Sequence, residues 1–279
     1  MQNPTLFQKA YTRIQAEILA GSLPPGRRVS ETSLAARLGL GRAPVREALR
    51  QLHSDGVMRQ IPRYGTVVQV PRRRDVVDIY ELREALETYA VGKAVERIGP
   101  EQKERLRQLL RRMGDTARAL KRSGAGRLSP DAIQEHLTAD MAFHAVLVSA
   151  AGNVQIADTI RRKRVLARIL ATHVSPFDLP MLSRVYRFHR RILRAVERGD
   201  AVAARRAMAE HVRTGMREML EHFDRRQQQR DHDEANMLAE ADLALLDPRM
   251  DLLERQGDRF LDPGQGRPAM DDTEEASLL

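Results

Sequence analysis

Four residues in the second half of the chain have the types and the spacing of a metal site. In the stretch DMAFH, Asp140 and His144 are four residues apart, so a helix places both on one face. His189 and His211 lie at nearly equal distances on either side of a Gly-Asp helix break at residues 199–200. Two helices folded back at that break would place both imidazoles roughly 15 Å from the turn, at 1.5 Å rise per residue. The spacing therefore predicts that His189 and His211 are level with one another, as a shared metal would require.

One carboxylate and three imidazoles suit a divalent ion such as Zn²⁺, Ni²⁺ or Mn²⁺ and leave coordination positions for water or a ligand carboxylate. The alternative is that each histidine is separately a core or surface residue; for this set of four we favour the metal. His136 could compete as a ligand, but we expect it to lie beyond the pocket. The remaining histidines show no partner pattern and are expected at the surface: His53, His173, His222 and His232.

A second candidate group is the guanidinium of Arg83. Its helical stripe is shared by Ile79, Leu86 and Ala90, so the side chain is expected to point toward the core. A buried guanidinium needs an anionic partner, because burying a charge alone is costly. That partner is either an anionic ligand or Glu87, one helical turn further on.

The stretch GLGRAPVREALRQLHSDG, residues 39–56, repeats a positive charge at Arg42, Arg46 and Arg50. A helix that starts near Gly41 turns these arginines to solvent or to a partner and buries the opposite face, made of Val45, Ala48, Leu49 and Leu52. The N-terminal residues of a recognition helix contact base edges and phosphates, and the arginine fork can bond guanine O6 and N7 together. The alternative is a solvated basic face held partly by Glu47.

The surrounding pattern predicts the elements that would position this helix. Residues 5–20 follow a helical period, GSLPPG breaks the chain, and Ser30 can cap a second helix that stops at Gly39. After the arginine helix, GVMRQIPRYGTVVQV indicates two short strands around residues 62–65. Three helices and a hairpin within about 70 residues are compatible with a winged helix-turn-helix.

From Asp75 to about Arg226 the pattern is one helix after another, which predicts an antiparallel bundle. Breaks are expected at residues 98–100, 123–126, 152–153, 175–176 and 199–200. Beyond residue 230 a short helix near 235–246 is conceivable, but the composition favours disorder. The fold class expected is mainly α: a winged helix-turn-helix at residues 1–72, an all-helical bundle at 73–228 and an acidic, disordered tail at 229–279.

The charge of the 279-residue chain is unevenly distributed. The net charge is +9, residues 1–74 hold 13 basic and 4 acidic side chains, and residues 231–279 hold 4 and 14. A concentrated positive charge indicates a surface that meets a polyanion. The absence of cysteine excludes disulfides, thiolate metal sites and cysteine nucleophiles. There is neither a signal peptide nor an apolar run of membrane-spanning length, so we expect a cytoplasmic protein without a membrane partner.

The run RRVSETSLAARLGLGRAPVREALRQLHSDGVMRQIPRYGTVVQV resembles the N-terminal domain of GntR-type transcription regulators. The resemblance covers residues 5–70 and implies DNA contacts from Arg42 and Arg46, with Arg28 and Arg50 as weaker candidates. It also implies that the wing, Arg63-Tyr64-Gly65, lies near the minor groove. Gly41 stands where the family usually has a serine, so a hydroxyl contact to phosphate would be absent.

Residues 75–223 resemble the all-helical ligand-binding domain of the FadR subfamily, the FCD domain. The shared signals are ELREALE, D-x-x-F-H followed by Ala-Gly-Asn at residues 151–153, and the His189 to His211 segment. The resemblance implies metal ligands at Asp140, His144, His189 and His211, and effector binding by Arg83 and Asn153. The chain departs from the pattern at Phe188, where a glutamate is common, and in a longer connection over residues 114–135.

These observations together predict a DNA-binding transcription regulator rather than an enzyme, with no catalytic residues. We expect a homodimer on a short pseudo-palindromic operator in double-stranded DNA. It would act as a repressor whose operator affinity is modulated by a small organic-acid effector, a carboxylate bound at the metal site. The alternatives are a metal-dependent hydrolase with an appended DNA-binding domain, and a non-specific DNA binder that contacts phosphates alone.

Overall fold

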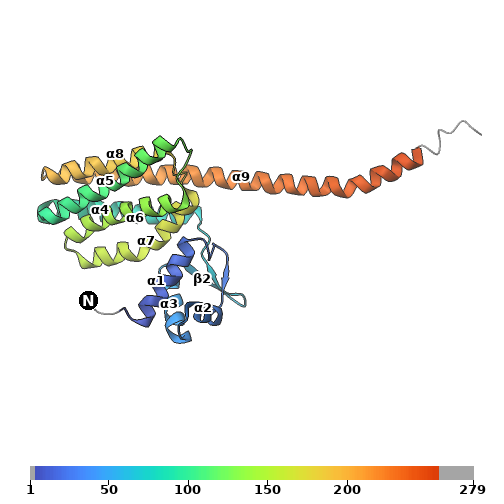
Figure 1. The fold of residues 1–279 in the computed structure, drawn as a ribbon, viewed down its shortest axis with the longest axis horizontal. Helices are drawn as coiled ribbons and strands as arrows, with labels where there is room; N and C mark the ends of the chain where they lie inside the picture. Colours follow the sequence, from blue (N-terminus) through green and yellow to red (C-terminus); the bar gives the residue numbers. More distant parts are fainter. Residues whose placement is uncertain (1–3, 258–279) are drawn as a thin grey trace, which may run out of the picture. The chain divides into compact units, whose positions relative to one another are not determined.

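The computed structural model describes residues 4–257 and is mainly helical, as the sequence predicts (Figure 1). The N-terminal part holds three helices and three strands: α1 (Leu6–Leu19), β1 (Arg28–Val29), α2 (Glu31–Leu38), α3 (Arg42–Ser54), β2 (Met58–Ile61) and β3 (Gly65–Val68). The remainder is helical: α4 (Arg73–Arg97), α5 (Pro100–Ser123), α6 (Pro130–Ala150), α7 (Val154–Val174), α8 (Leu179–Glu197) and α9 (Ala201–Gly257).

Local signals set the ends of the N-terminal helices. Thr5 closes a capping box with Gln8 at the start of α1, and the Ser30 hydroxyl accepts the backbone N–H of Ser33 at the start of α2. Gly39 ends α2 in the left-handed conformation, with φ of 63°, which a glycine adopts without steric cost. The arginine helix α3 begins directly after Gly41, as expected.

The wing is a three-stranded antiparallel sheet in the order β1-β3-β2. Strand β3 pairs with β2 in the expected hairpin, with Ile61 opposite Gly65. It also pairs with β1, with Arg28 opposite Val67, and the sequence pattern did not predict this strand. Two residues are too short for a period-2 signal, so only the tertiary pairing defines β1.

The helical part forms one bundle whose expected breaks are all found. Helix α5 packs against α6 and α8, and α4 packs against α6 and α7. The buried faces of these helices form a continuous apolar core around Phe143, Leu106, Leu109, Met113 and Ile192. Among residues 4–257, no helix is both long enough and apolar enough to cross a membrane.

Helix α9 extends past residue 228, where the sequence led us to expect a tail without regular structure. Residues 229–257 are helical and belong to a separate compact unit that starts at Gln227. The segment is rich in good helix formers, and side-chain hydrogen bonds one turn apart, from Gln227 to Asp231 and from Gln229 to Asp233, support it. The remaining part of the expected tail, residues 258–279, lies outside the described residues.

Candidate metal centre and DNA-binding surface

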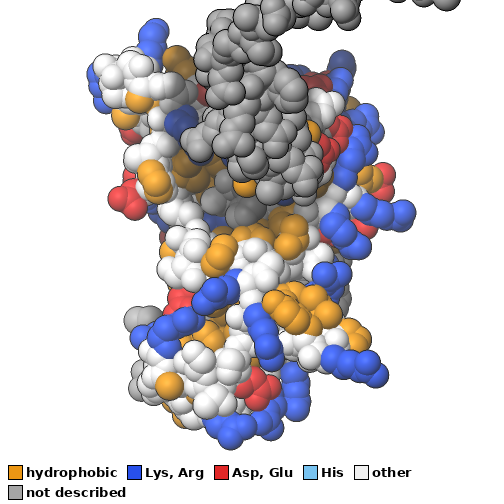
Figure 2. All heavy atoms as spheres, turned by 90° about the vertical axis from the view of Figure 1, so that its right-hand side faces the viewer, with side chains coloured by type: hydrophobic (Ala, Val, Ile, Leu, Met, Phe, Trp, Pro, Cys, Tyr) orange, Lys and Arg blue, Asp and Glu red, His pale blue; other side chains and the backbone are white. Residues whose placement is uncertain are grey.

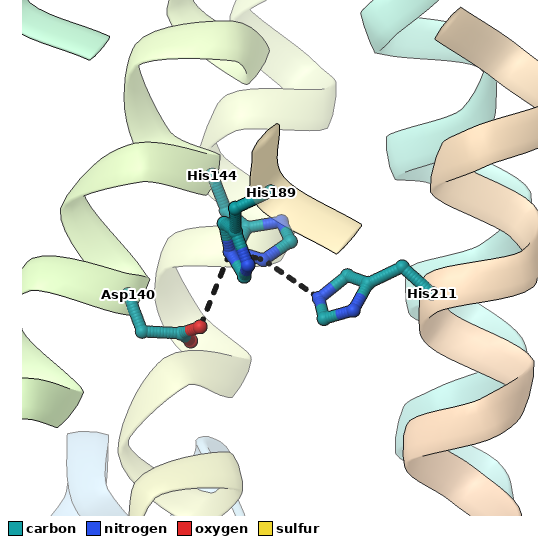
Figure 3. A group of neighbouring side chains, drawn as sticks. All are labelled: Asp140, His144, His189 and His211. Atoms are coloured by element: carbon teal, nitrogen blue, oxygen red, sulfur yellow. Dashed lines mark hydrogen bonds and ion pairs between the residues drawn. The ribbon is translucent and has the colours of Figure 1, made fainter. Parts of the chain in front are cut away.

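The four residues predicted to share a metal come together at the centre of the helical bundle (Figure 3). Asp140 and His144 project from α6, His189 from α8 and His211 from α9. One ligand atom from each residue lies within 4.8 Å of the others. The three histidines are buried, and the exposed fraction of the Asp140 side chain is 23%. The tight helical turn between α8 and α9 brings two of the histidines level, as their spacing predicts.

The nitrogen atoms that face one another are all Nε2. His189 Nε2 lies 3.2 Å from His144 Nε2 and 3.2 Å from a carboxylate oxygen of Asp140. His211 Nε2 lies 3.3 Å from His144 Nε2. The rings are therefore oriented so that their Nε2 atoms and one carboxylate oxygen surround a common point.

The other ring nitrogens fix the proton positions. His189 Nδ1 lies 2.8 Å from the carbonyl oxygen of Val185, which can only accept, so Nδ1 carries the proton. His144 Nδ1 lies 2.5 Å from Glu87 Oε2, and this close ion-pair contact with a carboxylate places the proton of the ring on Nδ1. In the neutral form of both rings, which is the form that binds a metal ion, the two Nε2 atoms are acceptors that face each other without a hydrogen between them. A bound cation satisfies this arrangement, and a carboxylate behind a ligating histidine is the usual outer partner of such a site.

Burial and neighbouring charge define the protonation states around this point. Burial would raise the pKa of the Asp140 carboxyl, but His189 and the other imidazoles hold it well below its usual value. Burial lowers the pKa of His211 well below the usual histidine value, and the adjacent His189 and His144 lower it further. An ionised carboxylate and a neutral imidazole are the forms that bind a metal ion.

Arg83 is held by the partner within the protein that the sequence left as an alternative. Its Nε donates to Glu87 Oε1 at 2.8 Å, and the guanidinium lies 5.1 Å from the ring centre of Tyr80. Burial would raise the pKa of Glu87, but Arg83 and His144 hold it well below its usual value. Glu87 thus connects Arg83 to the candidate metal ligand His144. The sequence signal for this contact was limited to the one-turn spacing between Arg83 and Glu87.

A cavity of about 140 Å³ opens beside the four residues. Its lining includes Asp140, His144 and His211, together with Arg83, so the candidate metal and the predicted effector arginine share one space. Further polar residues in the lining are Glu87, His136, Lys163, Arg168, Ser175, Glu218 and His222. A volume of this size holds a ligand of a few heavy atoms, because about 150 Å³ accommodates benzene.

Three expectations about this cavity need correction. His136 does not lie beyond the pocket: it is buried in the cavity wall, and its Nδ1 has no hydrogen-bond partner among the described residues. His222 also lines the cavity instead of lying on the open surface. Asn153, predicted to bind the effector, is outside the lining and caps α7 through the backbone N–H of Ile156. Side-chain direction depends on helix packing, which single-sequence periodicity could not supply.

The predicted DNA-contacting arginines all lie exposed on the N-terminal part. Arg42, Arg46 and Arg50 stand on the outer face of α3, opposite the buried Val45 and Leu52. Figure 2 shows Lys and Arg side chains gathered on the lower part of the view, with few Asp and Glu between them. The exposed Arg42, Arg46 and Arg50 themselves make the outer face of α3 basic.

Two arginines of the N-terminal part, Arg46 on α3 and Arg28 on β1, have defined side-chain contacts. Arg46 Nε donates to Glu31 Oε2 at 2.9 Å, so one edge of its fork is held by α2. In the wing, the Arg28 guanidinium lies 5.3 Å from the ring centre of Tyr64. Arg63, at the wing turn, has φ of 63°, a conformation uncommon for residues other than glycine. Arg28, Arg63 and Tyr64 are thus exposed together at the tip of the sheet, beside the half-buried Gly65.

Comparison with known proteins identifies the family. The sequence pattern described as "Bacterial regulatory proteins, gntR family" matches residues 6–68, and the FCD domain matches residues 78–214. The chain belongs to the GntR family of transcription regulators and has the FadR-like combination of a winged helix-turn-helix with an FCD domain.

Known relatives agree with this assignment. The chain is 37% identical over 59 residues to the uncharacterized HTH-type transcriptional regulator YdhC of Bacillus subtilis, a match that spans 26% of that relative and 21% of this chain. The structure of E. coli McbR/YncC matches with a TM-score of 0.66 at 20% identity, over 79% of this chain and all of that one. A GntR regulator from Rhodococcus matches with a TM-score of 0.60 at 23% identity, over 77% and 97% of the two chains. At these identities the structural matches show a shared fold.

The buried His136 predicts a pH dependence of stability in metal-free protein. Burial lowers the pKa of His136, so the unfolded chain binds a proton at a pH where the folded protein does not. The free energy of unfolding should therefore decrease as pH falls below about 6.5, by at most about 1.4 kcal/mol per pH unit from this residue. Urea unfolding with a chelator present measures it. His136→Gln should reduce the slope and exposed His53→Gln should not; equal slopes for all three would contradict the role of His136.

The converging Nε2 atoms predict the effect of removing one ligand. His189→Ala should lower metal affinity by more than the roughly 100-fold that loss of an outer partner causes, because it removes a direct donor. Elemental analysis and metal titration of purified protein measure this, with circular dichroism to verify folding. The matched control is His222→Ala, which changes a cavity histidine outside the four-residue group. Full metal content and unchanged affinity in folded His189→Ala would show that His189 is not a metal ligand.

Proposed function

We propose that the protein is a transcriptional repressor that binds a specific operator and is controlled by a small carboxylate bound at a metal centre. The observation that carries this proposal is the cluster of Nε2 acceptors, which opens into a cavity of about 140 Å³ in the same chain as a winged helix. We place DNA binding in residues 1–72 and effector binding in residues 73–228. A regulator of this kind acts in the cytoplasm, where its operator is.

The residues of the chain have distinct roles in this proposal. Asp140, His144, His189 and His211 hold a divalent ion, Zn²⁺, Ni²⁺ or Mn²⁺, which supplies Lewis-acidic coordination positions when bound. Three of these residues line the cavity, so an ion that they held would be accessible to a ligand in the cavity. Glu87 fixes the ring of His144, and Arg83 adds a positive charge to the same wall. A carboxylate is the ligand whose charge and oxygen atoms match this wall.

On the DNA side, we propose that Arg42 and Arg46 contact base edges and phosphates in the major groove. Arg28, Arg50 and the wing residues Arg63, Tyr64 and Gly65 take the flanking contacts. A homodimer would present two such surfaces to the halves of a short pseudo-palindrome. Effector binding then changes operator affinity if the effector favours one arrangement of the dimer over another.

The surroundings of the metal site support a regulator over a metal-dependent hydrolase. A hydrolase needs a carboxylate or imidazole free to remove a proton from metal-bound water. Among the described residues, the two further carboxylates of the cavity wall are already engaged in ion pairs: Glu87 with Arg83 and Glu218 with Arg184. Neither of these carboxylates is therefore free to act as a general base, which favours a regulator; the base candidate that remains in the wall is the imidazole of His136.

The recognition-helix assignment predicts the effect of Arg46→Ala. An operator would first be selected from random duplexes with wild-type protein. Loss of the Arg46 fork should then weaken operator binding by about 1–3 kcal/mol and relax specificity at one position of each half-site. Fluorescence anisotropy on single-base operator variants measures both effects, with Arg122→Ala at the exposed end of α5 as a charge-matched control. Unchanged affinity and base preference would remove Arg46 from the DNA contacts.

The effector assignment predicts a coupled response to carboxylates. In a thermal-shift screen of metal-loaded protein, a matching carboxylate at 100 times its Kd should stabilise the fold by about 2.7 kcal/mol. The same compound should change the affinity for the operator, and removal of the metal should abolish both effects. A carboxylate that stabilises the protein but leaves operator affinity unchanged would contradict control by the effector.

A further inference from the structure

Arg168 on α7 lines the cavity, but it belongs neither to the candidate metal site nor to the Arg83–Glu87 pair. Its Nη2 donates to the side-chain oxygen of Gln134, and lies 3.4 Å from the backbone oxygen of Gln134 and 3.3 Å from Thr138 Oγ1. Its Nε is buried and has no hydrogen-bond partner among the described residues. Burial lowers the pKa of Arg168, in contrast to Arg83, whose neighbouring Glu87 raises it. Arg168 therefore lies in the cavity wall with neutral partners only.

A half-buried guanidinium with neutral partners is incompletely compensated. Among the side chains that the structure describes, neither Arg168 nor Lys163, the other cation that α7 contributes to the cavity, forms an ion pair. The carboxylates of the wall are committed elsewhere, to the candidate metal site or to Arg83 and Arg184. Arg168 and Lys163 thus give the α7 part of the cavity lining two cationic side chains that are separate from the metal centre.

We propose that the effector carries two anionic groups, that Arg168 receives the second one, and that Gln134 transmits this event to the DNA-binding domain. The inference rests on the proposed function, in which the first carboxylate binds at the metal centre beside Arg83. Gln134 and Thr138 precede Asp140 by six and two residues on α6, which is roughly 9 and 3 Å along the helix axis and roughly 120° and 160° around it, so Arg168 contacts a neighbouring face of α6. This separation and the small cavity fit a short dicarboxylate.

Gln134 links Arg168 to the end of α1. Its side-chain nitrogen donates to the carbonyl oxygen of Leu19 at 3.2 Å, while its side-chain oxygen accepts from Arg168. Arginine has donors only and a carbonyl oxygen accepts only, so the two partners allow a single orientation of the amide. Leu19 is the last residue of α1, and the next residue after Arg168, Ile169, is buried in the apolar core of the DNA-binding domain.

This geometry gives a direct physical connection between ligand and DNA-binding domain. An anion that takes over Nη2 of Arg168 removes the donor that orients Gln134. The contact of Gln134 with Leu19 then loses its support on the cavity side. Because Arg168 and Ile169 are adjacent on α7, a small displacement of the arginine also acts on the packing between α7 and α1. Each ligand state therefore favours a different position of α1, which is what coupling between the two sites requires.

The number of charges is tested with matched pairs of ligands. Metal-loaded protein is titrated calorimetrically with malonate, succinate and glutarate, and with propionate, butyrate and valerate, which have the same carbon numbers and one carboxylate. At least one dicarboxylate should bind about tenfold or more tightly than its partner, since a hydrogen bond to a charged group contributes about 1.5–3 kcal/mol. Equal affinities within every pair would overturn the inference.

Two variants assign the second charge to Arg168. Arg168→Gln should reduce the preference for the dicarboxylate to near onefold without changing the affinity for the monocarboxylate. Gln134→Glu should do the same by a different route, because it supplies Arg168 with an internal carboxylate, and it keeps the test decisive if Arg168→Gln does not fold. Arg162→Gln, at an exposed position of α7, is the control. A preference that survives in folded Arg168→Gln or in Gln134→Glu would refute the assignment.

The relay is tested by operator affinity with and without saturating dicarboxylate. Gln134→Ala should bind the dicarboxylate at least as well as wild type, yet lose most of its effect on operator affinity; full retention of the effect would overturn the relay. The outcomes separate the two proposals. If wild-type protein binds no carboxylate, the proposed function fails as well. If it binds monocarboxylates and dicarboxylates equally and still responds on DNA, only the role of Arg168 fails.

Discussion

The helical domain depends on one electrostatic constraint: imidazole acceptors that face one another inside an apolar bundle. When His144 and His189 are neutral, with their protons on Nδ1 toward Glu87 and a backbone carbonyl, their Nε2 lone pairs converge. Acceptors at such distances repel unless a cation lies between them, and the ionised Asp140 favours that cation. The same Glu87 also neutralises Arg83. A single buried carboxylate thus orders both the candidate metal site and the adjacent arginine.

Helix α7 relates this site to the DNA-binding domain. Three successive residues of this helix face different environments. Arg168 lines the cavity, and Ile169 is buried in the core of the winged helix. Leu170 packs with Leu166 and Met219 in another part of the bundle. Packed helices shift as units because their interiors are close-packed. In the mechanism that we propose, a change in cavity occupancy acts on the DNA-binding domain through α7 and, in parallel, through the hydrogen bonds of Gln134.

The fold could be predicted almost completely because its signals are local. Helix periodicity, Gly and Pro breaks and capping residues placed the helices from Leu6 to about Arg226, and the motifs identified the family. Strand β1 was not predicted, because a strand of two residues is too short to show an alternating apolar and polar pattern. The end of α9 was also missed, because a polar composition favoured disorder although the residues are good helix formers. Side-chain hydrogen bonds one turn apart supply local support that composition does not reveal.

The sequence by itself determined which residues could form the metal centre, because spacing on a helix and across a helical turn is fixed by the rise per residue. Only the tertiary structure decided the partners of those residues. Arg83 is paired with Glu87, Glu87 orients His144, His136 and His222 turn into the cavity, and Asn153 caps a helix outside it. These contacts join helices distant in the chain. They depend on how each helix rotates when it packs, which no local pattern encodes.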